Sequence, residues 1–311
     1  MTGLRQAVDD YLKLRRSLGH QMNEAAYLLP DFAAFLDDRG EQTVTIAAAL
    51  DWVKAREPGA VTATAGPRRI TAVRGFARYL SGTDPATEVP PLGLVPYRQR
   101  RGQVFLYSDA DVSAVMAAAR ETIAQPLRAA TYYTLVGLLS AAGLRVGEAI
   151  KLDRGDIDWD QGVLHIRETK FGKSRLVPLH DSAVTALREY GTLRDRLMPS
   201  PKDPSFFVSL TARRLIYAVV CPTFRSLVDA AGVGIGAPHP PRLHELRHSF
   251  AVRTLLRWYR AGDDVQAKIP SLSTYMGHRE PRHTYHYLSA APELLALAAA
   301  RRDDIRKAPR S

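Results

Sequence analysis

The segment from residue 241 to residue 289, PRLHELRHSFAVRTLLRWYRAGDDVQAKIPSLSTYMGHREPRHTYHYLS, constrains the chain more than any other stretch. It holds a His-x-x-Arg-His pattern with helical periodicity, from His244 to His248, a Gly-His pair ending at His278, and Tyr287 nine residues beyond that pair. His244 and Arg247 are three residues apart, so a helix places them on one face. We therefore expect these two side chains to point at a single anion.

The same pentapeptide also matches the H-E-x-x-H pattern, in which two histidines on one helix face bind zinc and the glutamate acts as a general base. Positions 251–254 hold Ala, Val, Arg and Thr, so no third ligand stands at metzincin spacing. Arg247 would also place a cation close to the metal. Taken alone the pentapeptide is ambiguous between a metal site and an anion site, but its surroundings favour the anion, and we expect no metal and no cofactor.

The overall charge favours a polyanionic partner. The 311 residues include 43 Lys and Arg against 32 Asp and Glu, which gives a net charge of +11 and a pI near 9.9. Basic side chains that neutralise phosphates release counterions, so nucleic acid is the expected partner, and a basic protein without such a partner is the alternative. Cys221 is the single cysteine, which excludes an intramolecular disulfide and fits a reducing compartment. Without a membrane span or a signal peptide in view, we expect a cytoplasmic protein with no membrane contact.

Residues 1–82 show helical periodicity and predict a compact helical unit. Its fourth predicted helix, about 67–80, carries apolar residues on one side and basic residues among its other positions. Such a single-signed row suits contact with DNA phosphates, and a merely solvated face is the alternative. The candidate DNA-contact residues of this helix are Arg68, Arg69, Arg74 and Arg78.

Residues 83–106 are rich in Pro and Gly and show no periodicity, which indicates a linker between two units. The linker ends in basic residues that suit a phosphate backbone, although a flexible tether whose charges contact nothing is equally compatible with the pattern. These further candidate DNA contacts are Arg98, Arg100 and Arg101.

Residues 107–311 predict a larger second unit that is mostly helical. A long apolar helix at about 126–142 ends at Gly143, which is a typical helix stop. Alternating segments at 162–167 and 174–179 surround a turn and indicate a β-hairpin, and 206–208 is a candidate third strand. The predicted fold class is mainly α with a small antiparallel β-sheet, that is, α+β.

Four motifs in order resemble those of the tyrosine recombinases, the integrase and Xer-like DNA strand-exchange enzymes. They are SAAGLRVGEAIKL from Ser140, TKFGKSRLVPL from Thr169, HELRHSFA from His244, and YMGH from Tyr275 followed by TYHYL from Thr284. The resemblance covers about 107–300 and extends more weakly to 3–82. It implies a SAM-like helical bundle that serves as a core-binding domain at residues 1–82, and a tyrosine-recombinase catalytic domain at 107–311.

The resemblance also implies the roles of the residues that match the motifs. Its catalytic set is Arg145, Lys170, His244, Arg247, His278 and Tyr287, supported by Glu148 and His248. The two arginines would clamp the scissile phosphate, because a guanidinium meets two phosphate oxygens at once and keeps its charge. The lysine would protonate the leaving 5′ oxygen, and the tyrosine would be the nucleophile. Glu148 would orient Arg145.

Two of these assignments have a nearby competitor. The family spacing of nine residues after the Gly-His pair selects Tyr287 over Tyr285, which would then be a packing or DNA-contact residue. Alignment on the RLVPL segment selects Lys170 over Lys173 in the same turn.

The activity that the resemblance implies is site-specific recombination through a covalent 3′-phosphotyrosine intermediate. The expected partners are double-stranded DNA sites and further copies of the chain, with a tetramer on two sites. A terminal helix at 292–300 would dock on the neighbouring protomer, and packing of this helix on its own core is the alternative. A mobile-element integrase and a Xer-like resolvase both fit. The alternative from another class is a non-catalytic DNA-binding protein that has kept the recombinase fold.

Overall fold

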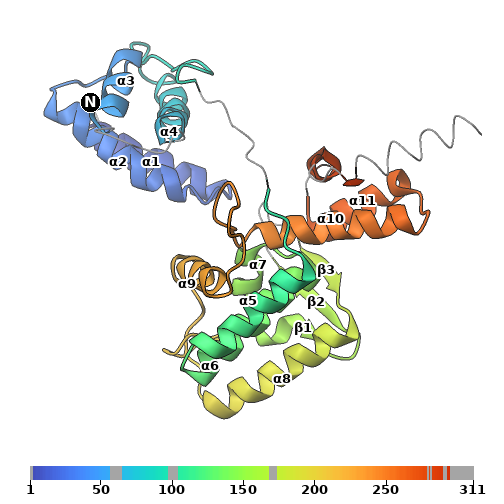
Figure 1. Ribbon diagram of the computed structural model, residues 1–311. Coiled ribbons are helices and arrows are strands. Elements are labelled where there is room, and N and C mark those ends of the chain that lie inside the picture. Colours follow the sequence, from blue (N-terminus) through green and yellow to red (C-terminus); the bar gives the residue numbers. More distant parts are fainter. Residues whose placement is uncertain are drawn as a thin grey trace, which may run out of the picture. The chain divides into compact units, whose positions relative to one another are not determined.

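The computed structural model describes residues 3–56, 65–96, 104–167, 174–278, 280, 282–289 and 293–294. The chain divides into two compact units, residues 1–101 and 102–311 (Figure 1). This division falls inside the segment 83–106 that the sequence assigns to a linker. Among the described residues, no helix is long and apolar enough to cross a membrane.

The first unit is a bundle of helices whose apolar residues recur every three or four positions. Along the second helix, Leu29, Phe32, Ala33 and Leu36 are all buried, so one face of this helix lies in the core. Phe32 packs on Trp52 with ring centroids 5.0 Å apart. The described helices of this unit are α1 (Leu4–Ser17), α2 (Asn23–Asp38), α3 (Ile46–Ala55) and α4 (Ala65–Leu80).

Residues 83–96 belong to the first unit, although the sequence places 83 at the start of the linker. The Glu88 backbone N–H donates to the Val44 carbonyl at 2.8 Å, and the Glu88 carboxylate accepts from the Ile46 N–H at 2.7 Å. Val89 and Leu94 pack against the helical core. The Pro-rich composition here reflects an extended segment held by the bundle. Residues 97–103 lie outside the described residues.

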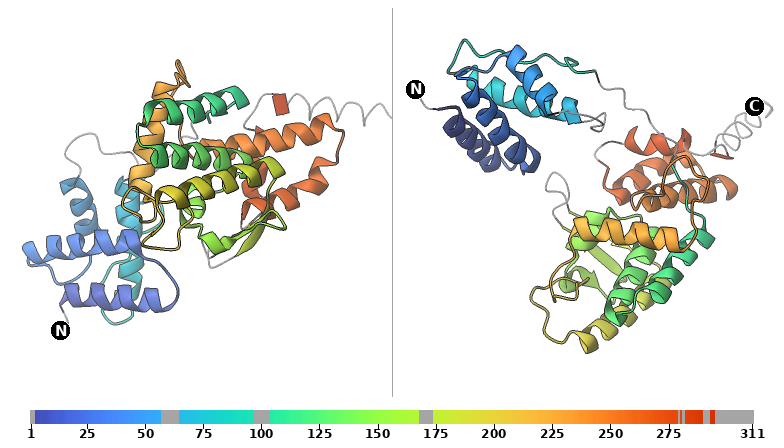
Figure 2. Two further views of the ribbon diagram at one scale, coloured as in Figure 1. Left: turned by 90° about the horizontal axis from the view of Figure 1, so that it is seen from below. Right: turned by 60° about the vertical axis from the view of Figure 1, so that its left-hand side comes forward.

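The second unit is built around α6 (Pro126–Ala142), which is buried on most of its surface and is packed by α5, α8 and α10 (Figures 1 and 2). This burial explains why its sequence is apolar on nearly every side. The other helices of this unit are α5 (Asp109–Thr122), α7 (Val146–Lys151), the 3₁₀ helix η1 (Arg154–Asp156), α8 (Asp181–Leu197), α9 (Tyr217–Ala230), α10 (Glu245–Arg260), α11 (Val265–Met276), α12 (Arg282–Tyr285) and the 3₁₀ helix η2 (His286–Ser289).

A three-stranded antiparallel sheet, in the order β1-β2-β3, lies in the second unit. Its strands are β1 (Ile157–Asp158), β2 (Val163–Ile166) and β3 (Arg175–Pro178), and Leu164 pairs with Val177. The predicted hairpin is therefore present. The predicted third strand at 206–208 is wrong, because these residues are buried in the core and only Val208 forms an isolated bridge, to Arg214. A short apolar run does not distinguish a strand from a buried connection. The mainly helical fold class with a small antiparallel sheet is confirmed.

Candidate active site

The turn between α6 and α7 places Arg145. Gly143 ends α6 with φ of 59°, and a Cβ at this position would come within 2.3 Å of the Phe250 ring on α10. Only glycine combines this left-handed backbone with so close an approach. The chain then turns directly into α7, and Arg145 precedes the first residue of that helix. The glycine that the sequence predicts as a helix stop thus also brings Arg145 close to α10.

Three arginines from three different segments converge on the C-terminal end of α11, where they donate to three consecutive backbone carbonyls. Arg175 donates to the Tyr275 carbonyl at 2.8 Å, Arg247 to Met276 at 2.5 Å, and Arg145 to Gly277 at 2.8 Å. The last carbonyls of a helix have no partner within the helix and carry partial negative charge. The end of α11 therefore binds the guanidiniums of three arginines and fixes their positions. It also leads directly into His278.

Glu148 is the acidic partner of this cluster. Its Oε1 accepts from Arg145 Nη1 at 2.7 Å, its Oε2 accepts from the Arg145 backbone N–H at 2.9 Å, and both oxygens accept from Arg175. Burial by itself would raise the pKa of the Glu148 carboxyl. The hydrogen bonds and charge of Arg175, and then the bonds from Arg145, outweigh this effect and lower the pKa to about 2. Glu148 is thus ionised and holds Arg145 in place.

The two candidate phosphate-clamp residues differ in exposure. Arg247 is only 2% exposed, and its Nη1 donates to the Gly143 carbonyl at 2.7 Å. Burial, followed by the charge of Arg145, lowers the pKa of Arg247 to about 10, so the group stays protonated at neutral pH. The Arg145 side chain is 32% exposed. Arg145 is therefore more accessible to an incoming anion than Arg247 is.

The rings of the candidate histidines and of Tyr287 form a contiguous cluster beside these arginines. The centroid distances are 5.0 Å between His244 and His248, 5.2 Å between His248 and Tyr287, and 6.0 Å between His278 and Tyr287. His278 Nδ1 also forms a hydrogen bond of 2.8 Å with the Thr284 hydroxyl. α10, the turn after α11, and the 3₁₀ helix η2 each supply part of this cluster, so segments about forty residues apart meet in one place.

Tyr287 and Tyr285 occupy different environments. Tyr287 is 3% exposed, whereas Tyr285 is 47% exposed. Burial raises the pKa of Tyr287, and the charge of Arg247 and a hydrogen bond from it act in the opposite direction. Tyr287 is therefore protonated at neutral pH and needs a base before it can attack. The geometry joins Tyr287, and not Tyr285, to the histidine cluster.

His244 is neutral at neutral pH. Although His244 is an exposed residue, the surrounding protein removes enough water from it to lower its pKa below the ordinary value. The charges of Arg247 and Arg145 lower this pKa further, and Glu148 opposes them. A neutral imidazole follows from this direction. Among the described residues, no group of three or more His, Cys, Asp or Glu side chains is arranged to hold a metal ion.

The predicted DNA-contact row on α4 does not form as one exposed face. Arg74 is 9% exposed, and its Nε and Nη2 donate to the Pro90 and Pro91 carbonyls, each at 2.7 Å. This corrects the prediction for Arg74, whose guanidinium holds the segment 83–96 on the bundle. The periodicity misleads here because a long side chain can reach past its own helix to the carbonyls of another segment.

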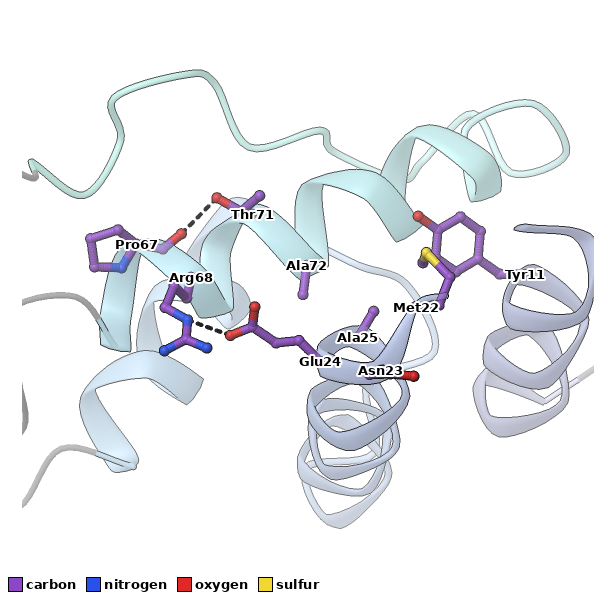
Figure 3. Close-up of a pocket in the computed structure, with 9 residues that line it drawn as sticks. All are labelled: Tyr11, Met22, Asn23, Glu24, Ala25, Pro67, Arg68, Thr71 and Ala72. Atoms are coloured by element: carbon purple, nitrogen blue, oxygen red, sulfur yellow. Dashed lines mark hydrogen bonds and ion pairs between the residues drawn. The ribbon is translucent and has the colours of Figure 1, made fainter. Parts of the chain in front are cut away.

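The other arginines of α4 are more exposed than Arg74. Arg68 forms a 2.5 Å ion pair with Glu24 of α2 across a surface pocket, and Figure 3 shows the two side chains turned toward each other. Arg69 lies over the Trp52 ring and donates to the Arg56 carbonyl at 3.3 Å. Arg78 is exposed. DNA contact by these three residues stays a prediction, and the candidates Lys170, Lys173, Arg98, Arg100 and Arg101 lie outside the described residues.

We expect the Arg74→Met variant to loosen the segment 83–96, because two carbonyls lose a charged donor at a cost of about 1–3 kcal/mol. The exposed Arg78→Met is the matched control and should change stability by less than about 0.5 kcal/mol. Hydrogen exchange of the peptide covering 83–96, measured in the full chain, reports the difference. Equal exchange in the two variants would contradict the structural role of Arg74.

Arg175, the first residue of the RLVPL segment, belongs to the site although it is not among the residues that the sequence predicts for it. The alternation along β3 does contain a signal. Arg175 stands two residues before the buried Val177 and so lies on the same inward face of the strand. A charged side chain on a buried face needs a partner, which here is Glu148.

Comparison with known proteins agrees with this geometry. The model of the phage integrase family matches residues 106–293. The Sinorhizobium fredii protein y4rB, which is named an integrase/recombinase, is 42% identical to this chain over 307 residues. The match covers 97% of each chain. The tyrosine recombinase XerD of Bradyrhizobium diazoefficiens is 27% identical, covering 94% of this chain and 86% of its own. The chain belongs to the phage integrase family, whose members include the tyrosine recombinases.

Solved structures share the fold. The Tn1549 transposon integrase in complex with transposon right end DNA has a TM-score of 0.66 at 15% identity, covering 97% of this chain and 99% of that one. The XerH site-specific recombinase bound to a palindromic difH substrate has a TM-score of 0.65 at 17% identity, covering 90% and 79%. At these identities the likeness concerns the fold alone.

Proposed function

We propose that the chain is a site-specific DNA recombinase that breaks and rejoins strands through a covalent bond to Tyr287. One observation carries this proposal, namely the convergence of Arg145, Arg247 and the histidine rings around a buried tyrosine. The relatives named as integrases and Xer recombinases support the same activity. A non-catalytic DNA-binding protein has no need for a protonated tyrosine, two fixed guanidiniums and a neutral imidazole in one place.

The chemistry assigns each group a step. The Tyr287 hydroxyl attacks the scissile phosphorus and releases its proton, while the bond from phosphorus to the 5′ oxygen breaks. His244 either helps to take up that proton or orients the phosphate. Arg145 and Arg247 stabilise the charge on the non-bridging oxygens, a contribution that is often the largest in such reactions. His278 donates a hydrogen bond to one of these oxygens, and Lys170 protonates the leaving 5′ oxygen. The phosphotyrosine conserves the bond energy, so a 5′ hydroxyl can reverse the step without a cofactor.

The protein partners of the reaction follow from its symmetry. Exchange of strands between two duplexes requires a nucleophile for each strand, so four copies of the chain on two sites form the complete assembly. Because Tyr287 is 3% exposed, its hydroxyl has to be uncovered before a phosphate reaches it. Leu294 is 1% exposed and packs in the same cluster as Tyr287 within its own chain. Release of the terminal segment 292–300 from this contact, to dock on a neighbouring protomer, would couple the uncovering of Tyr287 to the presence of a second copy.

A pool of nicked duplexes with randomised sequence around the nick tests the proposal. In a nicked duplex the short fragment between the cleaved bond and the nick, which carries the freed 5′ hydroxyl, diffuses away, so the covalent adduct accumulates. We expect wild-type protein to yield adducts that survive denaturing electrophoresis, and the recovered DNA identifies the preferred site. Peptide mass spectrometry of the adduct should place the phosphate on Tyr287. Retained DNA binding without any adduct would overturn the enzyme in favour of the non-catalytic alternative.

A further inference from the structure

Each of the three guanidinium nitrogens of Arg175, on β3, donates a hydrogen bond within the protein. Nε donates to the Tyr275 carbonyl at 2.8 Å, Nη1 to Glu148 Oε1 at 3.0 Å, and Nη2 to Glu148 Oε2 at 2.8 Å. The side chain is 10% exposed, and Glu148 is 8% exposed. The two parallel bonds to one carboxylate form the strongest geometry available to this pair. With three donors committed in this way, Arg175 is placed to support the site and not to bind the phosphate.

The charge balance of the cluster depends on Arg175. One carboxylate, Glu148, is shared by the guanidiniums of Arg145 and Arg175. Together the three groups carry a net charge of +1, and Arg145 is the more exposed of the two arginines. If Arg145 were the sole partner of Glu148, that pair would be neutral, and its attraction for a phosphate would fall accordingly.

Arg175 also joins three elements mechanically. It reaches from β3 to Glu148 on α7 and to the last turn of α11. Gly277, with φ of 67°, lies so close that a Cβ there would stand 2.8 Å from Arg175 Nη1. The Gly277 carbonyl is itself the acceptor for Arg145. The same turn continues into His278, so the position of β3 bears on both a candidate clamp residue and a candidate histidine.

We propose that Arg175 is a positioning residue for strand cleavage, which shares the Glu148 carboxylate so that Arg145 keeps its charge for the phosphate, and which fixes β3 to the end of α11. This inference rests on the proposed recombinase function. A buried ion pair that serves stability alone is the competing explanation. The positioning role and the purely stabilising role predict different cleavage rates when Glu148 and Arg175 are both replaced by neutral residues.

The test uses the full chain and the nicked duplex recovered with the wild-type protein. For Arg175→Met we expect the rate of adduct formation at saturating DNA to fall about 10- to 100-fold, the size of effect that outer-sphere partners have at metal sites. The DNA concentration that gives half the maximal rate should change by less than about threefold, because the proposal gives Arg175 a role in positioning Arg145 and none in binding DNA. Arg175→Lys, which keeps the charge but not the fork, should lie between Arg175→Met and the wild type.

The double variant Arg175→Met/Glu148→Gln is decisive. Glu148→Gln alone leaves two guanidiniums without their carboxylate and should also lose rate. In the double variant the net charge of the cluster returns to +1, the wild-type value, so we expect at least about tenfold recovery relative to Arg175→Met, a non-additive result typical of residues in contact. A double variant as slow as the slower single variant, or slower, overturns the proposal.

A matched control separates positioning from stability. Arg194 on α8 is 4% exposed and donates to the Phe206 carbonyl at 2.7 Å, away from the cluster. Arg194→Met should lower the thermal unfolding temperature of the chain as Arg175→Met does, and yet keep the wild-type rate of adduct formation. An equal loss of rate in the two variants would overturn the positioning role. Wild-type protein that forms no adduct would instead count against the proposed function itself.

Discussion

The Tyr287→Phe variant should form no detectable covalent adduct on the nicked duplex, because it lacks the attacking oxygen. The phenylalanine ring otherwise has the same shape as the tyrosine ring. Loss of a nucleophile costs about 10⁴-fold or more in rate even when binding is retained. The ring is 3% exposed and packs against His248, so Phe fills the same space and the fold should persist. Equilibrium binding of the duplex, measured by fluorescence anisotropy, should stay close to that of the wild type.

Tyr285→Phe provides the matched control, since it removes the same oxygen two residues away. Tyr285 is 47% exposed, and its substitution should leave the rate of adduct formation within about threefold of the wild type. The opposite pattern, with an adduct in Tyr287→Phe and none in Tyr285→Phe, would move the nucleophile to Tyr285. An adduct in both variants would mean that the protein attacks through a different side chain.

Much of the second unit follows from local sequence rules. Gly143 predicts the end of α6, the alternating segments predict the β2-β3 hairpin, and the spacing of His244 and Arg247 predicts a shared face. These features depend on contacts within a few residues or on a two-residue period, which a sequence shows directly. The short β1 at 157–158 does not, because two residues carry no period and its pairing with β2 depends on the rest of the unit.

The partners within the site are much less visible in the sequence. Three arginines meet three successive carbonyls at the end of α11, yet carbonyls carry no sequence signal, and Arg175 and Tyr275 stand 100 positions apart. The same limit explains the error at Arg74, whose acceptors are the carbonyls of two prolines. Residue type and spacing indicate which groups do chemistry, whereas tertiary packing decides which arginines are held inside and which remain available to DNA.

The two candidate phosphate-clamp arginines should respond differently to lysine. In Arg145→Lys the charge remains, but one ammonium cannot serve Glu148, the Gly277 carbonyl and two phosphate oxygens as the fork does. We expect the rate of adduct formation to fall by about 10²- to 10³-fold, the range for loss of a preorganised donor. The exposed Arg257→Lys on α10 is the control and should keep the wild-type rate. A rate for Arg145→Lys within about threefold of the wild type would contradict its role as a clamp.

Arg247→Lys should lose rate to a similar extent and, unlike Arg145→Lys, should also lose stability. Arg247 is 2% exposed and ties the Gly143 and Met276 carbonyls together, so a shorter set of donors leaves a buried acceptor unpaired at about 1–3 kcal/mol. For a unit of this size that cost lowers the unfolding temperature by about 2–12 °C. Calorimetry of both variants beside the adduct assay distinguishes the cases. Equal unfolding temperatures would mean that Arg247 does not hold α6 and α11 together, and that its burial serves the phosphate alone.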